Sequence, residues 1–191
     1  MPAIARHDPA AFNTAGRVHW FGALSQHGQA ARLGIDAYAD DAGVTRVTIE
    51  PAAPGQSLTV SVCAPAPGLR CNIEAGTGLL LAGNELLAPI RLNFSVGVSA
   101  VAAFIVARAP IGSVFTPRIW VECNASGAFV PFDGTPGATG DIWTRVGNSV
   151  APFVGAAATG GDRITGVQFE AVRPGAPPFD PLGIGYLYCL P

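Results

Sequence analysis

The polar and aromatic residues around Trp120 are the most suggestive candidates for a binding site in this chain. In the segment TPRIWVEC, residues 116–123, alternation places Arg118, Trp120 and Glu122 on one side of an extended strand. An exposed indole flanked by a guanidinium and a carboxylate offers a flat apolar surface with hydrogen-bonding groups at its edge, which suits a sugar ring. The alternative is that the indole covers a sheet edge and that its N–H bonds within the protein.

A second pair of an aromatic residue and an arginine follows further along the chain. Trp143 and Arg145 occur in DIWTRVG, a segment that we expect to form a loop. We therefore predict one ligand-binding set, which consists of Arg118, Trp120, Glu122, Trp143 and Arg145. Replacing Trp120 with alanine should weaken binding by about 1–4 kcal/mol, the usual range for a truncated aromatic anchor, with little loss of stability.

Signatures of catalysis and of metal binding are weak. The sequence contains no Gly-x-Ser-x-Gly elbow, no His-Glu-x-x-His motif and no P-loop. Two loop-like segments each contain a pair of acids whose oxygens could hold a structural calcium ion, although such acids also serve as turn residues. These pairs are Asp40 with Asp41 and Asp133 with Asp141. His19 and His27 lack an accompanying carboxylate or cysteine cluster, which favours ordinary surface histidines. We predict no catalytic residue and no cofactor, with calcium as the weaker alternative.

Four cysteines allow one disulfide to be predicted with a physical reason. Cys63 and Cys71 enclose a short loop rich in proline and glycine, and Cys63 falls on the polar side of its predicted strand. We expect these two residues to be bonded, which would stabilise the fold by roughly 2–3 kcal/mol. Cys123 and Cys189 either form a second disulfide or remain buried thiols that pack as small apolar side chains. Disulfides are typical of an oxidising compartment.

The composition argues against several classes of function. Hydrophobic residues make up 49% of the 191 residues and charged residues only 13%, which indicates a large core and a surface suited to a partner. The net charge of −2 and the lack of a basic run argue against binding of nucleic acid. The sequence has no stretch of about 20 apolar residues, so we expect no membrane span.

Short apolar runs separated by glycine and proline predict an all-β fold. In residues 151–172 a turn at 160–162 precedes strict alternation, with Val167 and Phe169 on the apolar side. We expect one domain, residues 1–191, that forms an antiparallel β-sandwich of eight or more strands in a jelly-roll arrangement. The same alternation predicts further inward side chains, which are Val47, Ile49, Leu58, Val60, Val62, Leu92, Phe94, Val96, Val98, Ile119 and Val121.

Three local features refine this prediction. The run VAAFIV, residues 101–106, is apolar throughout, which predicts a strand covered on both faces. The turn NASG, residues 124–127, predicts a hairpin whose glycine takes a positive φ. Only PAAFNTAG, residues 9–16, predicts a helix, with Asp8 as its cap, a proline in its first position and Gly16 at its end.

Five segments carry a resemblance to a known family. They are DPAAFNTAG near the start, RLNFSVGVSAVAAFIV, FTPRIWVECNASGAFVPFDG, APFVGAAATGGDRITGVQFEAV and the closing FDPLGIGYLYC. In apolar pattern and glycine placement, the chain resembles the globular β-sandwich domain of secreted bacterial proteins of the PEP-CTERM-sorted type. The resemblance covers nearly the whole chain and implies a β-sandwich and secretion. The sequence contains neither that family's Pro-Glu-Pro tail nor a signal peptide, which leaves two alternatives: a trimmed mature protein, or a protein that is not secreted.

Three classes of function fit these observations. The first, which we predict, is a non-catalytic extracellular binding module for a carbohydrate or another cell-surface ligand. The second is a structural or self-assembling surface protein, because low charge and a high apolar fraction suit association between copies. The third is a glycoside hydrolase or lyase on a jelly-roll scaffold, since a fold alone does not exclude catalysis.

Overall fold

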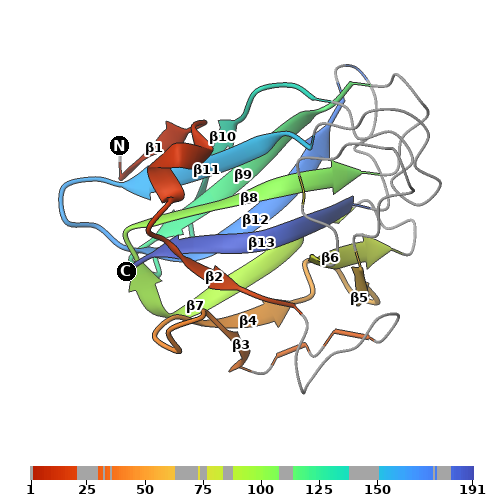
Figure 1. Ribbon diagram of the computed structural model, residues 1–191, viewed down its shortest axis with the longest axis horizontal. Coiled ribbons are helices and arrows are strands. Elements are labelled where there is room, and N and C mark those ends of the chain that lie inside the picture. Colours follow the sequence, from red (N-terminus) through yellow and green to blue (C-terminus); the bar gives the residue numbers. More distant parts are fainter. Residues whose placement is uncertain are drawn as a thin grey trace.

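Two antiparallel sheets pack face to face in the computed structural model of the chain (Figure 1). The structure describes residues 2–20, 30–31, 33–34, 36–62, 73, 77–83, 88–107, 114–137, 151–173, 175 and 182–191. Every pairing between its named strands is antiparallel. The predicted all-β antiparallel sandwich is therefore confirmed.

The first sheet has seven strands in the order β1-β11-β8-β13-β6-β5, and β2 pairs with β13 outside this path. Its central strands, β8 and β13, lie in front of the second sheet in Figure 1. Its members are β1 (Ala3–Arg6), β2 (Gly16–Val18), β5 (Ser57–Val62), β6 (Gly78–Gly83), β8 (Ala100–Ala107), β11 (Phe153–Ala158) and β13 (Leu182–Leu190).

The second sheet has six strands in the order β10-β9-β12-β7-β4-β3. β9 and β12 form the longest described pairing, with Trp120 opposite Gln168 and Arg118 opposite Glu170. Its members are β3 (Asp36–Ala39), β4 (Arg46–Glu50), β7 (Ile90–Val98), β9 (Thr116–Cys123), β10 (Phe129–Asp133) and β12 (Ile164–Val172).

The main core fills the space between the two sheets. Val167 and Phe169 are fully buried there, together with Ile119 and Val121 of the neighbouring β9. Side chains alternate between buried and half-buried along β9 because successive residues of a strand point to opposite faces. The alternation read from the sequence thus correctly predicts which side of these strands is apolar.

Val96 is a correction to the predicted core. It was expected to point inward with the other apolar residues of its strand, but it is 64% exposed. The β7–β12 pairing shifts register between the pairs Ile164–Val98 and Gly166–Asn93, so β7 contains extra residues at this point. Such an irregularity changes the phase of the alternation, and Val96 therefore turns outward while Val98 is buried.

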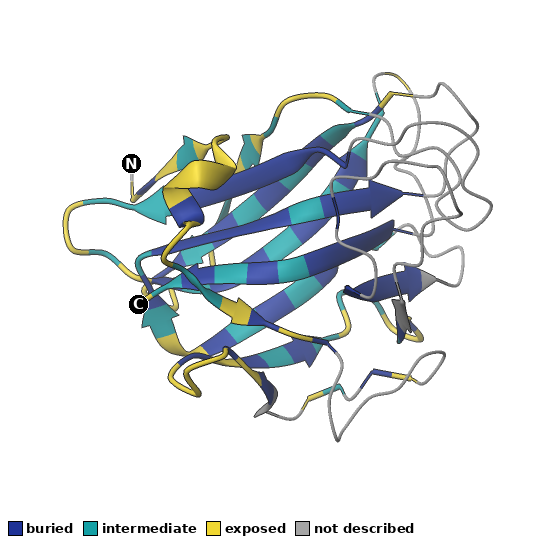
Figure 2. Cartoon of the chain, viewed as in Figure 1, coloured by how far each residue is buried: buried dark blue, intermediate teal, exposed yellow. Residues whose placement is uncertain are grey.

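The strand β8 is covered on both faces, as predicted from its unbroken apolar run. Val101, Ala103 and Ile105 face the main core, whereas Ala102 belongs to a separate outer cluster with Phe12 and other residues. Figure 2 shows β8 as buried along nearly its whole length. The outer face of the seven-stranded sheet is therefore apolar as well, which matters for the site described below.

The predicted N-terminal helix is present but shorter than expected. It is a single 3₁₀ turn, η1 (Pro9–Phe12), and Asp8 accepts a hydrogen bond from the backbone N–H of Ala10 at 2.9 Å. The predicted cap and first-position proline are correct. The predicted end at Gly16 is wrong, because Gly16 begins β2 and lies too close to Asp40 for a side chain.

The predicted hairpin between β9 and β10 is confirmed. Gly127 has a φ of 75°, and Phe129 lies opposite Glu122 in the register of the two strands. The turn before β12 likewise contains Gly160 and Gly161 at positive φ, a conformation that glycine adopts without steric cost. Among the described residues, no helix is long and apolar enough to cross a membrane.

Candidate functional site

The predicted binding residues of β9 lie on the outer face of the six-stranded sheet. Arg118, Trp120 and Glu122 are all half-buried, and they alternate with buried residues that face the core. Pro131 of β10 and Gln168 of β12 lie on either side of Trp120. The sequence correctly predicts that these three side chains share one face.

Their polar groups are already engaged within the protein. The Arg118 guanidinium donates to the Asp133 carboxylate at 2.5 and 3.0 Å, and its carbon lies 5.8 Å from the centre of the Trp120 ring. This hydrogen bonding lowers the pKa of Asp133 below its ordinary value. The Trp120 indole N–H donates to Glu170 at 2.9 Å. A ligand on this face would compete with these internal partners.

The neighbouring part of the same face is filled by side chains. A Cβ atom on Gly166 of β12 would lie 2.8 Å from the Glu122 carboxylate and 3.4 Å from the Phe129 ring. The guanidinium of Arg91 lies 5.3 Å from the centre of that ring. Glu122 also accepts a hydrogen bond from the Gly127 backbone N–H at 2.6 Å. The binding role predicted for this face stays a prediction.

Several predicted residues lie outside the described part of the chain. Trp143 and Arg145, the second half of the predicted binding set, are among them. Cys63 and Cys71, the predicted disulfide, are also outside it. Two alternatives were open for Cys123 and Cys189, a second disulfide or a pair of buried thiols. In the structure both are buried free thiols.

The acids and histidines considered for metal binding have other partners. Asp40 accepts hydrogen bonds from the backbone N–H groups of Val44 and Thr45 at 2.9 and 3.1 Å, as a turn residue does. Asp41 lies 2.6 Å from the imidazole of His19. Asp133 pairs with an arginine, as described above, and Asp141 lies outside the described residues. Within the described ranges, no three His, Cys, Asp or Glu residues cluster as metal ligands would.

A pocket lies on the opposite face of the molecule, on the outer side of the seven-stranded sheet. β13 pairs with β8 along one edge, whereas its other edge pairs first with β6 and then with β2. The register shifts between Ile184 and Leu187, where the partner on that second edge changes. Such irregularities often accompany functional sites because they re-aim side chains and open the ladder. The pocket lies directly over this point.

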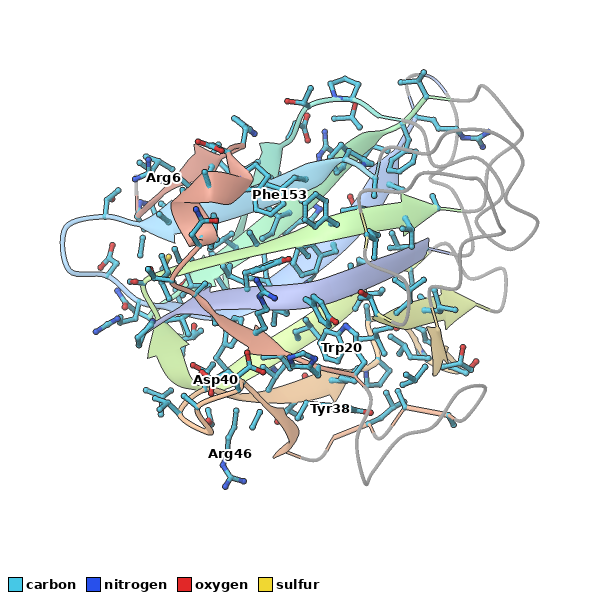
Figure 3. All side chains as sticks on the ribbon, viewed as in Figure 1. Arg6, Trp20, Tyr38, Asp40, Arg46 and Phe153 are labelled. Atoms are coloured by element: carbon cyan, nitrogen blue, oxygen red, sulfur yellow. The ribbon has the colours of Figure 1, made fainter. Side chains whose placement is uncertain are left out.

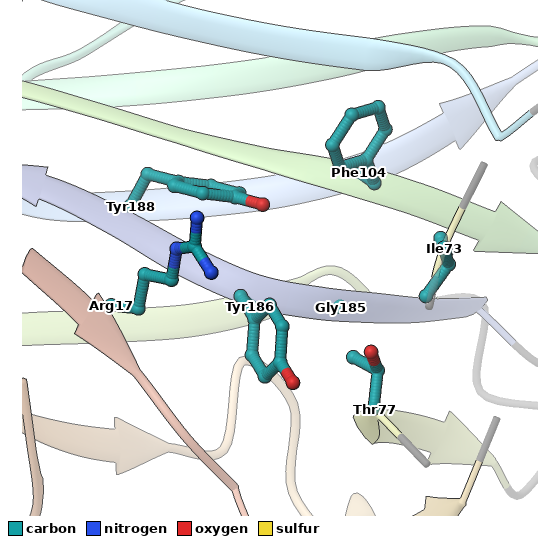
Figure 4. Close-up of a pocket in the computed structure, with 7 residues that line it drawn as sticks. All are labelled: Arg17, Ile73, Thr77, Phe104, Gly185, Tyr186 and Tyr188. Atoms are coloured by element: carbon teal, nitrogen blue, oxygen red, sulfur yellow. The ribbon is translucent and has the colours of Figure 1, made fainter. Parts of the chain in front are cut away.

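Aromatic rings and one arginine form much of the pocket wall. Figure 4 shows the Arg17 guanidinium between the rings of Tyr186 and Tyr188, with Phe104 beyond them. The guanidinium carbon lies 6.0 Å from the centre of the Tyr186 ring and 5.7 Å from that of Tyr188, a cation–π arrangement. Tyr188 also contacts Phe104 edge to face, with ring centres 6.3 Å apart. The rings and the cation therefore hold one another in place.

Gly185 lies at the bottom of the pocket and leaves space there because it has no side chain. A Cβ atom at this position would find its nearest neighbours, in Ile73 and Phe104, no closer than 3.9 Å. Gly183, two residues earlier, has no such space, because a Cβ there would lie 2.7 Å from Val106. The Gly185 carbonyl accepts a hydrogen bond from the buried Trp20 indole at 2.6 Å, which fixes the irregular backbone. Trp20 is labelled in Figure 3.

Thr77 closes the end of the pocket away from Arg17 (Figure 4). Its side chain is only 1% exposed, and its hydroxyl oxygen is buried without a hydrogen-bond partner among the described residues. A buried hydroxyl of this kind costs stability unless something binds it. The pocket has a volume of about 100 Å³.

Sequence reasoning did not find this pocket. In the sequence analysis the closing segment contributes only to the family resemblance. Two features of LGIGYLYCL could have indicated a site. A glycine in a strand interior often marks a bulge or a close approach of another group. Two tyrosines at alternate positions of a strand lie on one face of the sheet. Arg17 and Thr77 are 60 positions apart in the sequence numbering and carry no local signal. Only the pairing of β2 with β13 brings Arg17 to the tyrosines.

The chain was also compared with known proteins. No protein-family model matches it, and no curated protein is significantly similar to it. The resemblance to secreted bacterial β-sandwich domains therefore stays a prediction.

Proposed function

We propose that this protein is a non-catalytic carbohydrate-binding module and that its ligand occupies the pocket on β13. The observation that supports this most directly is the set of rings around Gly185. Tyr186, Tyr188 and Phe104 offer apolar ring surfaces, and Arg17 and Thr77 offer hydrogen-bond donors at two ends. Flat apolar surface combined with a few polar groups at its rim is the composition that suits a sugar ring.

The size of the pocket supports a single sugar unit as the group bound. Its volume of about 100 Å³ is smaller than the several hundred Å³ of a pocket for a drug-sized molecule. An engineered apolar cavity of about 150 Å³ holds benzene. The pocket is smaller than that cavity and a sugar ring is larger than benzene, so the pocket receives one edge of a single sugar unit and the remainder of the ligand lies along the outside of the sheet.

The lining of the pocket favours binding over glycoside hydrolysis. A glycosidase needs two carboxyl groups on either side of the scissile bond. None of the described residues that line this pocket is an aspartate or a glutamate. Self-assembly is likewise less well supported, because the exposed large apolar side chains of the described residues are spread over the molecule: Ile4 lies in the seven-stranded sheet, Val96 in the six-stranded sheet, and Val44 and Val114 outside the strands.

The finer fold assignment and the compartment are part of the same proposal. We propose a jelly roll formed by the last eight strands, in which β6-β13-β8-β11 faces β7-β12-β9-β10. The support for it is that these neighbours follow the strand orders of the two sheets, and that most connections along the chain cross from one sheet to the other. We further propose an extracellular location, which rests on the sequence resemblance and on the predicted Cys63–Cys71 disulfide.

The test is a glycan array followed by calorimetry on the best ligand with pocket variants. Gly185→Ala adds one methyl group where space exists, so we expect an unchanged fold and an affinity lower by about tenfold or more. Gly185→Val should remove binding. Thermal unfolding of each variant checks that the fold is retained.

Trp120→Ala is the matched comparison on the opposite sheet. Under our proposal it leaves the affinity unchanged. If Trp120→Ala removes binding and Gly185→Val does not, the ligand meets the six-stranded sheet and the pocket assignment is wrong. Release of reducing sugar from the bound ligand would show a hydrolase instead of a binding module.

A further inference from the structure

Each polar side chain among the described residues that line the β13 pocket can donate a hydrogen bond, and none of these residues carries a negative charge. Arg17 is cationic, Thr77 and the two tyrosines carry hydroxyl groups, and the remaining described lining residues are Ile73, Phe104 and Gly185. A site of this composition attracts a group that accepts hydrogen bonds and carries negative charge.

Arg17 has no acidic partner in the described part of the chain. Arg118 pairs with Asp133 and Arg91 with Glu50, whereas the guanidinium of Arg17 contacts only the two tyrosine rings among these residues. Stacking on rings leaves the edge of a guanidinium, which carries its N–H groups, available for hydrogen bonds. That planar edge matches the two oxygens of a carboxylate.

Among the described residues, the two acids that follow β3 in the chain are engaged with other groups. The carboxylate of Asp41 lies 2.6 Å from the imidazole of His19, whose ring in turn packs 4.6 Å from that of Tyr186. Asp40 is buried and accepts two backbone hydrogen bonds. Neither acid lines the pocket, so neither competes for Arg17.

We propose that the pocket binds a uronic acid unit of an acidic polysaccharide, with its carboxylate on Arg17. The ring would lie over Gly185 against Tyr186 and Phe104, and a ring hydroxyl would accept the hydrogen bond of Thr77. A uronic acid has a carboxylate at one carbon and hydroxyls at the others, so it meets polar groups at both ends of the pocket. The side chain of an acidic residue in a peptide has only one polar group, its carboxylate. With that carboxylate on Arg17, the side chain has no second polar group to pair with the Thr77 hydroxyl. This inference rests on the function proposed above and specifies its ligand.

The test compares three oligosaccharides of equal length by calorimetry: oligogalacturonate, its methyl ester and the neutral galactose oligomer. Oligogalacturonate should bind the wild-type protein at least about tenfold more tightly than the other two, since a hydrogen bond to a charged group contributes that much. Its affinity should fall with added salt, whereas that of the ester should not.

Variants of Arg17 assign the charge preference to this residue. Arg17→Gln should remove the advantage of the acid over the ester, and Arg17→Lys should restore only part of it because lysine lacks the planar edge. Arg46→Gln is the matched control, since Arg46 is exposed and points away from the molecule on the other sheet (Figure 3). It should change nothing.

Each other result overturns the inference. Equal binding of acid and ester, with both lost in Gly185→Val, would leave the proposed function standing and exclude the acidic ligand. Oligoglutamate that binds as tightly as oligogalacturonate would exclude the sugar as the recognised group. If the Arg17→Gln and Arg46→Gln proteins lose the same affinity, the charge effect is not local to the pocket. If none of the three oligosaccharides binds and the glycan array instead identifies a neutral glycan that Gly185→Val no longer binds, the proposed function stands and the acidic ligand is excluded; if the array identifies no glycan at all, the proposed function itself is wrong.

Discussion

Replacing Thr77 with valine should make the ligand-free protein more stable. The change removes a hydroxyl group and places a methyl group in nearly the same volume. The Thr77 side chain is 1% exposed, and its oxygen has no hydrogen-bond partner among the described residues. Folding therefore strips water from this hydroxyl without a compensating bond, which is an unfavourable contribution that valine avoids.

The expected size of the effect follows from that desolvation. An unsatisfied buried donor or acceptor costs about 1–3 kcal/mol. Because nearby groups adjust to some extent, we expect the free energy of unfolding to rise by about 1–2 kcal/mol. For a domain of this length each kcal/mol moves the unfolding midpoint by about 2–4 °C, so the midpoint should rise by about 2–8 °C.

The assay is urea unfolding followed by tryptophan fluorescence, with the midpoint raised and the m-value unchanged. Thr165→Val is the matched control, since the Thr165 hydroxyl accepts a hydrogen bond from the Ala125 backbone N–H at 2.8 Å. The same chemical change there should lower stability by about 1 kcal/mol. A loss of stability in Thr77→Val would refute the reasoning, because it would show that the hydroxyl is hydrogen-bonded in the folded protein.

The same variant links stability to binding. If a ligand uses the Thr77 hydroxyl, Thr77→Val should weaken binding by about 3- to 10-fold while it stabilises the free protein. A site that trades stability for function behaves in this way. Greater stability with unchanged affinity would mean that the ligand does not reach Thr77.

Three further predictions concern other parts of the fold. Gly183→Ala should cost about 1–3 kcal/mol because the added methyl group clashes with side chains of β6 and β8; wild-type stability in urea would contradict this. Asp133→Asn should cost less than about 1 kcal/mol at about pH 7, since its pair with Arg118 is partly exposed. That pair lowers the pKa of Asp133, so the difference in urea stability should vanish as the pH falls well below 4, and a difference that persists would argue against an ionic origin. Burial raises the pKa of the Cys123 and Cys189 thiols, so intact-mass analysis should find neither alkylated until the protein is unfolded; rapid alkylation of the native protein would show that they are accessible.

Local pattern was sufficient for the strands with a regular ladder. In β9 and β12, burial follows strict alternation, so Ile119 and Phe169 could be placed in the core from the sequence. Turn residues were equally readable, because Gly127 and Gly160 adopt a backbone conformation that disfavours other residues. Alternation failed at Val96, since an irregularity in pairing depends on the partner strand as well as on the strand itself.

The face of Trp120 could be predicted, but its surroundings could not. Alternation alone places Arg118 and Trp120 on one side. Whether their polar groups are free depends on Asp133 and Glu170, which come from two other strands. The register between strands decides these contacts, and the sequence of one strand does not contain it.

By itself the sequence determined an antiparallel β-sandwich, the apolar side of most strands and the positions of the tight turns. These properties depend on side-chain alternation and on backbone preferences, which act over a few neighbouring residues. Only the tertiary structure decided that β2 and β6 share one edge of β13 and leave a pocket over Gly185 between them. That pocket exists because segments distant in the sequence pair side by side, and the free energy of such pairing depends on the whole sheet.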